Sequence, residues 1–421
     1  MRRSPLLAAA LLTAAPLAVL PAATTAGATA APGSDRQVRF STFNASLNRG
    51  VAGQLESDLS TPDNVQAQNV AETIQRVRPD VLLVNEFDYA PAAVDLFRDN
   101  YLEVSHHGSR PIDYPYAYIA PSNTGVPSGF DLNNSGSVGT PGTQAGGDDS
   151  FGFGLFEGQY GMVVYSKYPI DTEAVRTFQT FRWVDMPGAM LPDDPTTPQH
   201  ADWYSAAELD DVRLSSKSHW DVPVDVNGST VHFLVSHPTP PVFDGAEDRN
   251  GTRNHDEIRF WADYVSSDAA DSSYMYDDAG VRGGLPATER FVVAGDLNSD
   301  PLDGDSVPGA AQQLLDHPRI NDAKAPKSAG GIWAAEVQGA ANLTHESHPR
   351  FDTADFDDRL CCGPGNLRAD YVLPSSDLKI LRSGIFWPTE DQKYYYLTGN
   401  FPFVPTSDHR QVWVDLQLPK R

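Results

Sequence analysis

The chain has 421 residues and is strongly acidic, with 31 Lys and Arg against 56 Asp and Glu and a formal net charge of −25. Such a surface repels polyanions, which argues against a protein whose task is to hold DNA or RNA tightly. Hydrophobic residues make up 40% of the chain, enough for a full core, so wholesale disorder is excluded. The two cysteines exclude a disulfide scaffold.

The N-terminus has the pattern of an export signal. Two arginines near the start precede an Ala/Leu-rich stretch over residues 6–20, and two A-x-A sequences follow it. We expect residues 1–30 to be a signal peptide cleaved after Ala28 or Ala30, with an uncleaved anchor as the alternative. The apolar run is too short to span a bilayer as a stable helix. The expected product is secreted and extracellular, without stable membrane insertion.

Short apolar runs separated by turn-rich stretches predict strands with a few helices between them. In chain order, strands are expected over residues 38–44, 80–86, 162–166, 231–236, 291–294, 372–373 and 412–418. One helix is expected to open at Thr61-Pro62-Asp63, with Thr61 as its N-cap, and to end before Pro79. A second helix is expected over residues 253–266. This alternation indicates an α/β unit of packed sheets.

Two stretches, near residues 122–150 and 185–197, are rich in turn-forming residues and poor in apolar ones. They predict long loop insertions. Because the strand pattern continues on both sides of each loop, we expect residues 36–421 to form a single domain.

Polar residues at the ends of predicted strands point to a functional site. Four strands end in such residues or are followed directly by them: Asn44, Glu86, His237, and Asp296 with Asn298. A strand that crosses the core and ends in a carboxylate, amide or imidazole delivers that group to the rim of a sheet. One such ending commonly just starts a turn. Four of them predict a cleft that gathers oxygen and nitrogen ligands.

Two later segments complete an ordered series of short motifs. The series is Phe43-Asn44, Asn85-Glu86, Ser236-His237, Gly295-Asp296-Leu297-Asn298, Ala369-Asp370-Tyr371 and Ser407-Asp408-His409. It resembles the endonuclease/exonuclease/phosphatase superfamily, which includes deoxyribonucleases, apurinic endonucleases, sphingomyelinases and inositol polyphosphate phosphatases, and the chain resembles a secreted bacterial-type member. The resemblance covers residues 36–418. It implies an α/β fold, a four-layer α/β/β/α sandwich of two mixed β-sheets packed face to face and flanked by helices.

The resemblance also implies a divalent cation and a division of catalytic roles. The candidate metal ligands are oxygens of Asn44, Glu86 and Asp408, which favour Mg²⁺ or Mn²⁺, with Ca²⁺ as an alternative. By resemblance, the catalytic residues are His237, Asp296, Asn298, Asp370 and His409.

In these roles Asp296 orients or deprotonates the attacking water, and Asn298 positions the phosphate or Asp296. His409 is a general base or acid held in one tautomer by Asp370, and His237 donates to a phosphoryl oxygen or to the leaving group. Which of Asp296 and His409 takes the proton from water stays open.

Three weaker patterns have ordinary alternatives. Arg253 or Asn254 is a candidate to bind the substrate phosphate, and a capped, solvated helix start is the alternative. Asp131, Asn133 and Ser135 match the first half of a calcium loop, which predicts a structural Ca²⁺ site with an Asx-rich turn as the alternative. The adjacent Cys361 and Cys362 form either a vicinal disulfide or two unpaired thiols.

The sequence as a whole predicts a secreted, divalent-metal-dependent phosphoester hydrolase. We expect a monomeric phosphatase or phosphodiesterase that acts on small or soluble phosphate esters. An extracellular DNA or RNA nuclease, for which nucleic acid is a substrate, is the alternative with the same catalytic core. The dispersed arginines and the acidic composition favour the phosphatase. A non-catalytic binding module with the same fold is the alternative from another class.

Overall fold

The structure, a computed structural model, describes residues 37–419. These residues group into one compact unit. The predicted signal peptide, residues 1–30, lies outside the described residues. Among the residues that are described, no helix is long and apolar enough to cross a membrane.

The first sheet has six strands in the order β12-β13-β1-β2-β4-β3. They are β1 (Gln37–Asn44), β2 (Val81–Asn85), β3 (Tyr116–Tyr118), β4 (Met162–Ser166), β12 (Lys379–Ile385) and β13 (Val412–Gln417). The β1 and β2 strands are parallel and the other neighbours are antiparallel. In the β1–β2 register Asn44 lies beside Asn85, so these two strands end at the same rim.

The second sheet has five strands in the order β11-β8-β7-β6-β5. They are β5 (Arg176–Thr177), β6 (His219–Val226), β7 (Ser229–Ser236), β8 (Phe291–Asp296) and β11 (Asp370–Pro374). The β7 and β8 strands are parallel, and the other neighbours are antiparallel. A tight turn at Asn227 and Gly228, both with positive φ, joins β6 to β7, as expected of a two-residue hairpin loop. A separate pair consists of β9 (Ala354–Asp355) and β10 (Asn366–Leu367).

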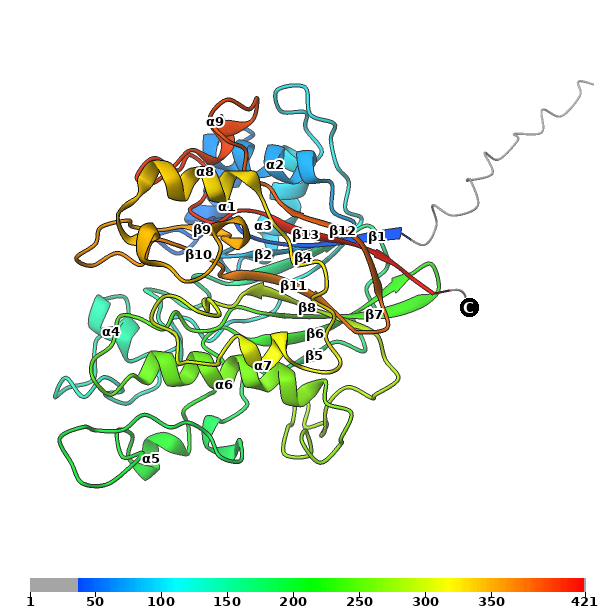
Figure 1. Ribbon diagram of the computed structural model, residues 1–421. Helices are drawn as coiled ribbons and strands as arrows, with labels where there is room; N and C mark the ends of the chain where they lie inside the picture. The colour runs from blue at the N-terminus through cyan, green and yellow to red at the C-terminus, as the bar shows by residue number, and fades with distance from the viewer. Residues whose placement is uncertain (1–36, 420–421) are drawn as a thin grey trace, which may run out of the picture. The chain divides into compact units, whose positions relative to one another are not determined.

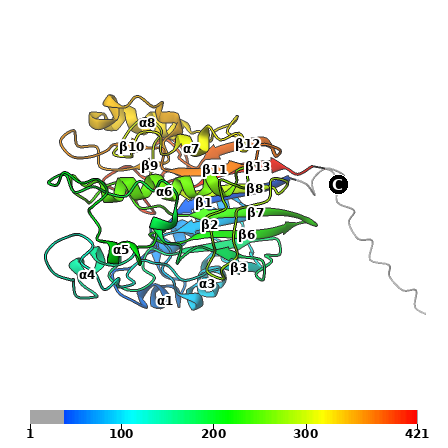
Figure 2. The same ribbon diagram turned by 90° about the horizontal axis from the view of Figure 1, so that it is seen from below.

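The two sheets pack face to face between layers of helices (Figure 1). Phe40 of β1 and Phe233 of β7 meet in the central core, with ring centroids 5.2 Å apart. The outer face of the first sheet packs on α1 (Gln54–Leu59), α2 (Val65–Val77) and α3 (Pro91–Phe97). The outer face of the second sheet packs on α6 (Arg249–Tyr264) and α7 (Gln312–Leu315), and α6 runs along it (Figure 2). The predicted four-layer sandwich of two mixed sheets is therefore confirmed.

Short helices occupy the connections. They are α4 (Gln144–Asp148), α5 (Ala206–Leu209), α8 (Ala329–Gln338), α9 (Tyr395–Thr398), a π-helical turn (Arg98–Leu102) and 3₁₀ turns at Trp183–Asp185, Ala340–Thr344 and Pro349–Phe351. Residues 122–150 and 185–197 contribute no strand to either sheet, and the first stretch carries α4.

The predicted start of the first long helix was wrong by three residues. The N-cap of α2 is Asn64, whose side chain accepts a hydrogen bond from the Ala67 N–H at 3.0 Å, and not Thr61. An Asn cap satisfies the same unpaired N–H groups that Thr would satisfy.

Candidate active site

The topology brings the predicted polar strand ends to one place. Asn44 ends β1, and Glu86 follows β2. In the second sheet His237 follows β7, and Asp296 is the last residue of β8. Asp370 opens the antiparallel strand β11 directly opposite Asp296 in the register. Parallel neighbours end at the same edge of a sheet, so these residues reach a common rim.

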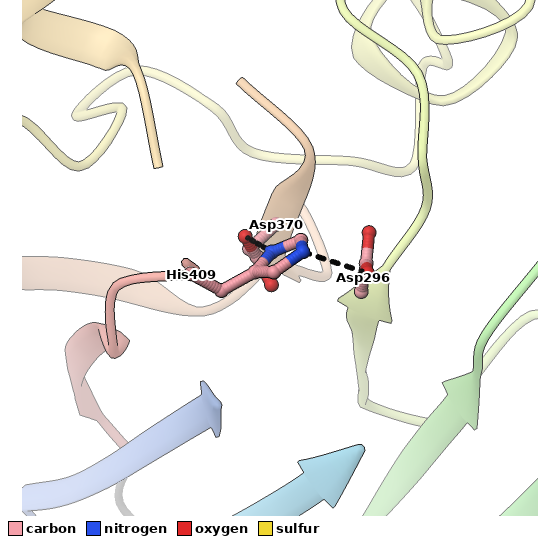
Figure 3. Close-up of side chains that lie close together, drawn as sticks. All are labelled: Asp296, Asp370 and His409. Atoms are coloured by element: carbon pink, nitrogen blue, oxygen red, sulfur yellow. Dashed lines mark hydrogen bonds and ion pairs between the residues drawn. The ribbon is translucent and has the colours of Figure 1, made fainter. Parts of the chain in front are cut away.

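A linear chain of three side chains lies at the centre of this rim (Figure 3). The Nδ1 atom of His409 lies 2.8 Å from Asp370 Oδ2, and its Nε2 lies 3.5 Å from Asp296 Oδ2. Thr353 Oγ1 donates a second hydrogen bond to Asp370 Oδ2 at 2.8 Å. With its Nδ1–H committed to Asp370, the His409 ring is held in one orientation, and its Nε2 points at Asp296.

The Ser407-Asp408-His409 segment is fastened to the end of β1. Ser407 Oγ donates to the Asn44 carbonyl oxygen at 2.8 Å and accepts the His409 N–H at 3.0 Å. Arg410 is buried, and its guanidinium donates to the Ser407 carbonyl oxygen and pairs with Asp355 at 2.7 Å. These contacts explain how a loop residue such as His409 is positioned without lying on a strand.

Burial and charge act in opposite directions on the pKa values of this chain of side chains. Burial raises the pKa of Asp370 to about 6, although His409 partly offsets it. Burial alone would lower the pKa of His409, but Asp370 and Asp296 raise it well above the ordinary histidine value. Burial would raise the pKa of Asp296, but His409 and His237 together hold it below its ordinary value. At neutral pH His409 is therefore charged and Asp296 is ionised.

Asp296 accepts hydrogen bonds on both of its oxygens. Asn44 Nδ2 donates to Oδ2 at 3.0 Å, and His237 Nε2 lies 3.3 Å from the same atom. The Asn298 N–H donates to Oδ1 at 3.0 Å, and Asn298 itself has a positive φ of 52°. Asn298 Nδ2 donates to the Pro238 carbonyl oxygen, which ties the loops after β8 and β7 together.

His237 is buried, and burial together with the nearby Lys217 lowers its pKa to about 4. His237 is therefore neutral at physiological pH. Its Nδ1 atom is buried without a hydrogen-bond partner among the described residues.

The predicted metal ligands show the charge pattern expected of a cation site. Burial and the neighbouring Asp408 raise the pKa of Glu86 to about 7. Two carboxylates that repel each other in a low-dielectric site form a donor set that fits a divalent cation. Asn44, however, directs Nδ2 at Glu86 Oε1, at 3.1 Å, while its Oδ1 accepts the Ser46 N–H. To serve as the predicted oxygen ligand, Asn44 would have to turn its amide over.

A second group of side chains is also close enough together to hold a metal ion. Asp296, Asp370 and His409 each offer a ligand atom within 4.8 Å of one another. Each His409 ring nitrogen faces one of these carboxylates, so the imidazole already links them.

Two adjoining cavities open beside this rim, and they share Glu86, His237, Pro240 and Phe243. The larger has a volume of about 1110 Å³ and contains Asn298 and His409 in its wall. Among the described residues no Lys or Arg lines it, whereas these acidic residues do: Glu86, Asp296, Asp300, Asp303, Asp305, Asp357 and Asp408. The smaller cavity, of about 580 Å³, contains Lys217, Arg249 and Arg253. The two cavities therefore differ in charge.

The two candidate phosphate-binding residues on α6 lie in different places. Arg253 lines the smaller cavity, and its guanidinium donates to the carbonyl oxygens of Leu214, Phe151 and Arg213. Asn254 lines neither cavity. It is fully buried, and its Nδ2 donates to the Thr239 and Leu297 carbonyl oxygens at 2.8 Å. The structure therefore does not bring Asn254 to the cleft, and it gives this residue a positioning contact instead.

The candidate calcium loop is closed by its own backbone. Asp131 Oδ1 accepts the Ser135 N–H at 2.9 Å, and Asp131 Oδ2 accepts the Gly136 N–H at 2.7 Å. Asn133 Oδ1 also accepts the Ser135 N–H, at 3.1 Å. These contacts are those of the alternative, an Asx-rich turn, and Ca²⁺ binding by this loop stays a prediction.

Two residues beside the site were missed by the sequence analysis. Lys217 precedes β6 and lines the smaller cavity. Glu257 of α6 accepts the Ser216 and Thr239 N–H groups, both at 2.6 Å, and so fixes the loops that carry Lys217 and His237. The missing signal was β6 itself, because Pro223 in its middle argues against a strand. If β6 had been predicted, Lys217 would have stood out as a charged residue just before the start of a strand, in the same way as the other site residues.

Comparison with known proteins identifies the family of the chain. The model of the Endonuclease/Exonuclease/phosphatase family matches residues 41–409. No match to a curated protein was found.

Several solved structures are similar to the chain. An endonuclease/exonuclease/phosphatase from Beutenbergia cavernae DSM 12333 is 17% identical, with a TM-score of 0.46 and coverage of 91% of this chain and 72% of that one. TDP2 from C. elegans is 12% identical, with a TM-score of 0.42 and coverage of 91% and 75%. Sphingomyelinase C from Streptomyces griseocarneus is 15% identical, with a TM-score of 0.43 and coverage of 90% and 99%. Because the family model matches most of its length, this chain belongs to the endonuclease/exonuclease/phosphatase family.

Proposed function

We propose that this protein is a secreted, divalent-metal-dependent phosphoester hydrolase, a phosphatase or phosphodiesterase for small or soluble phosphate esters. Enzymes of its family typically hydrolyse phosphoesters. The observation that carries the proposal is the His409 imidazole, which contacts Asp370 through one ring nitrogen and faces Asp296 through the other. Export rests on the sequence pattern of residues 1–30.

The protonation states suggest how the work is divided. Hydrolysis forms a bond between a water oxygen and phosphorus, breaks the ester P–O bond, moves a proton from the water and returns one to the leaving oxygen. Asp296 is ionised and is held by several donors, which suits it to orient the attacking water, whereas its lowered pKa makes it a weak acceptor for the water's proton. His409 is charged at neutral pH, which suits it to stabilise the negative phosphoryl oxygens or to protonate the leaving group.

Glu86 and Asp408 are the residues that would hold a divalent cation. Their oxygen donors suit Mg²⁺ or Mn²⁺, and Ca²⁺ is an alternative with the same ligand preference. When bound, the cation supplies a positive charge that neutralises phosphate oxygens as charge builds up in the transition state. The pKa of Glu86, raised to about 7 by burial and by Asp408, supports this assignment.

A preference for small esters over nucleic acids is supported by the larger cavity. Its lining contains acidic residues and, within residues 37–419, no Lys or Arg. A nuclease needs basic residues along the path of the nucleic acid to neutralise its phosphates. The phosphates on either side of a scissile bond would here face carboxylates.

The test is a hydrolysis assay on protein that begins at residue 31. The substrates are 4-nitrophenyl phosphate, bis(4-nitrophenyl) phosphate, duplex DNA and sphingomyelin, each with Mg²⁺, Mn²⁺, Ca²⁺ or EDTA. We expect metal-dependent hydrolysis of a small ester that exceeds DNA cleavage, and a loss of at least about 100-fold in Asp296→Asn and His409→Gln.

Exposed residues provide matched controls. Asp171→Asn and His200→Gln make the same chemical changes on the surface and should retain activity, since both side chains are exposed. Equal rates in EDTA, or full activity in both site variants, would contradict the proposal. DNA cleavage far above small-ester hydrolysis would favour the nuclease instead.

A further inference from the structure

The smaller cavity has the features of a binding pocket next to the catalytic residues. Its volume of about 580 Å³ is typical of a small-molecule site, and it shares Glu86 and His237 with the larger cavity. A molecule whose phosphate lies at Asp296 and His409 can therefore extend past His237 into this pocket.

Lys217 is the most informative residue of the pocket wall. Its side chain is buried, with 6% of the residue exposed, and its ammonium group makes no hydrogen bond or ion pair with any residue that the structure describes. Buried lysines are normally paired, because a charge taken out of water without a partner costs several kcal/mol. Burial lowers the pKa of Lys217, and the negative charges of Glu257, Asp296 and Glu86 oppose this without forming an ion pair with the ammonium group.

Other groups of the pocket also have unused hydrogen-bonding capacity or positive charge. His237 Nδ1 and Thr239 Oγ1 are buried and have no hydrogen-bond partner within residues 37–419. Arg253 bonds to backbone carbonyl oxygens and not to a carboxylate, so its charge is not neutralised by a direct partner. Arg249 pairs with Glu247 at the same wall.

The remaining wall contains four aromatic side chains, together with other residues that include the carboxylates of Glu86 and Asp148. Tyr160, Tyr204, Phe153 and Phe243 line the pocket, and 87% of Phe243 is exposed, at the border shared with the larger cavity. Such side chains can contact a ring or a short carbon skeleton. The 122–150 insertion closes the pocket with Leu132, Gln144 and Asp148.

We propose that this pocket binds a second anionic group of the substrate, and that Lys217 is the residue that selects for it. The preferred substrate class is then a small phosphate ester that carries another phosphate or a carboxylate on a compact skeleton. The inference rests on the proposed function for its catalytic meaning. Its binding part concerns Lys217 alone and can be tested without turnover.

The binding test uses inorganic phosphate and calorimetry in EDTA, where metal-dependent hydrolysis is absent. Wild-type protein should bind phosphate, and Lys217→Gln should bind it about 10- to 100-fold more weakly, the usual effect of losing one hydrogen bond to a charged group. Lys327→Gln, which makes the same change at an exposed lysine, should bind as wild type does. Equal affinity in wild type and Lys217→Gln would overturn the proposal, whether or not the enzyme proves to be a hydrolase.

The selectivity test compares substrates that differ by one anionic group. Glucose 1,6-bisphosphate is paired with glucose 6-phosphate, and glucuronic acid 1-phosphate with glucose 1-phosphate, so that the two pairs distinguish a phosphate from a carboxylate. In at least one pair, kcat/KM should be higher for the substrate that carries the second anionic group. Lys217→Gln should reduce this preference about tenfold or more, mainly by raising KM for that substrate. An equal loss on both members of each pair would refute the proposal, because Lys217 would then act on the scissile phosphate.

A second variant guards against misfolding of Lys217→Gln. Arg249 lies at the edge of the pocket, and its side chain is 17% exposed, so Arg249→Gln disturbs the core less. It should reduce the same ratio about threefold or more. The proposal would also be refuted by two results together. The first is an unchanged kcat/KM ratio in a folded Arg249→Gln. The second is a folded Lys217→Arg that binds phosphate no better than Lys217→Gln does.

Discussion

Replacing Glu86 by Gln should stabilise the metal-free protein while removing its response to metal. The folded protein raises the pKa of Glu86 from 4.5 to about 7 through burial and the proximity of Asp408. A carboxyl group with a raised folded-state pKa costs no stability below its unfolded pKa. It costs progressively more as the pH rises to the folded pKa. Gln keeps an oxygen that can accept the Asn44 Nδ2–H, which Glu86 accepts at 3.1 Å, but it carries no charge.

The size of the effect follows from the pKa shift. Each pKa unit corresponds to about 1.4 kcal/mol, so full ionisation of Glu86 costs about 3 kcal/mol above pH 7. The Glu86 side chain is partly exposed, so solvent screens part of this cost. We therefore expect Glu86→Gln to raise the free energy of unfolding by about 2 kcal/mol at pH 8. At pH 5 the gain should fall below about 1 kcal/mol, because little of the carboxyl group is then ionised in the folded protein.

The assay is urea unfolding at pH 5 and pH 8, in EDTA and with Mg²⁺. At about ten times its dissociation constant, Mg²⁺ should stabilise the wild type by about 1.4 kcal/mol. It should stabilise Glu86→Gln much less. Glu173→Gln, at an exposed carboxylate, is the matched control and should behave as wild type. A loss of stability in Glu86→Gln at pH 8 in EDTA, or an undiminished response to Mg²⁺, would refute the reasoning.

Three further predictions follow from single contacts. In Asp370→Asn the pKa of His409 should fall, because the carboxylate 2.8 Å from its Nδ1 atom is removed. The kcat should drop about 10²- to 10⁴-fold. A pH–rate profile in which the limb assigned to His409 does not move to lower pH would contradict this prediction. Burial raises the pKa of Asp352 from 3.8 to about 9, so Asp352→Asn should stabilise the protein increasingly from pH 4 to pH 9. At pH 7 the gain in the free energy of unfolding should be at most about 4 kcal/mol. Urea unfolding that shows no gain at pH 7 would contradict this prediction. Phe233→Ala should lower the free energy of unfolding by about 3–5 kcal/mol, because Phe233 is fully buried against Phe40. A loss under about 1 kcal/mol in urea unfolding would show that Phe233 does not lie in the core between the sheets.

The sequence was most informative where a strand is buried on both faces. β2 and β8 are continuous apolar runs, so the polar residues at their ends, Glu86 and Asp296, could be recognised without knowledge of the sheet. The β1–β2 and β7–β8 pairs turned out to be parallel, which brings each pair of ends to one rim.

Two of the longer strands, β6 and β12, were not recognised from local pattern, and neither were the short strands β3, β5, β9 and β10. β6 contains Pro223, which is tolerated because β5 pairs with β6 at Trp220 and Asp221 and not at the proline. β12 lies at an edge, its apolar residues do not alternate regularly with its polar ones, and its register shifts between Ile380 and Arg382. An edge strand with a bulge and charged residues has little apolar alternation to reveal it.

Side-chain roles at the site depended on contacts that spacing does not contain. Arg253 and Asn254 are adjacent on α6, yet the first lines a cavity and the second is fully buried between two loops. Consecutive helical residues point about 100° apart, so a motif that names both of them cannot decide which one faces a ligand. In the Asp131 loop, likewise, the carboxylate oxygens accept backbone N–H groups, which a sequence motif does not show, and Ca²⁺ binding there stays a prediction.

The net charge of −25 and the basic wall of the smaller pocket are two parts of one electrostatic arrangement. Charges on the outer surface are screened over about 8 Å at physiological ionic strength, whereas a buried ammonium such as that of Lys217 is screened much less. The acidic surface therefore repels an extended polyanion along its whole length without cancelling the positive pocket locally. The acidic lining of the larger cavity also raises the local concentration of divalent cations. A small anion that reaches Lys217 meets favourable charge at its destination, whereas a nucleic acid would have to lay its remaining phosphates across carboxylates. Under the proposed function, the acidic composition would thus discriminate by the size of the substrate rather than against phosphate itself.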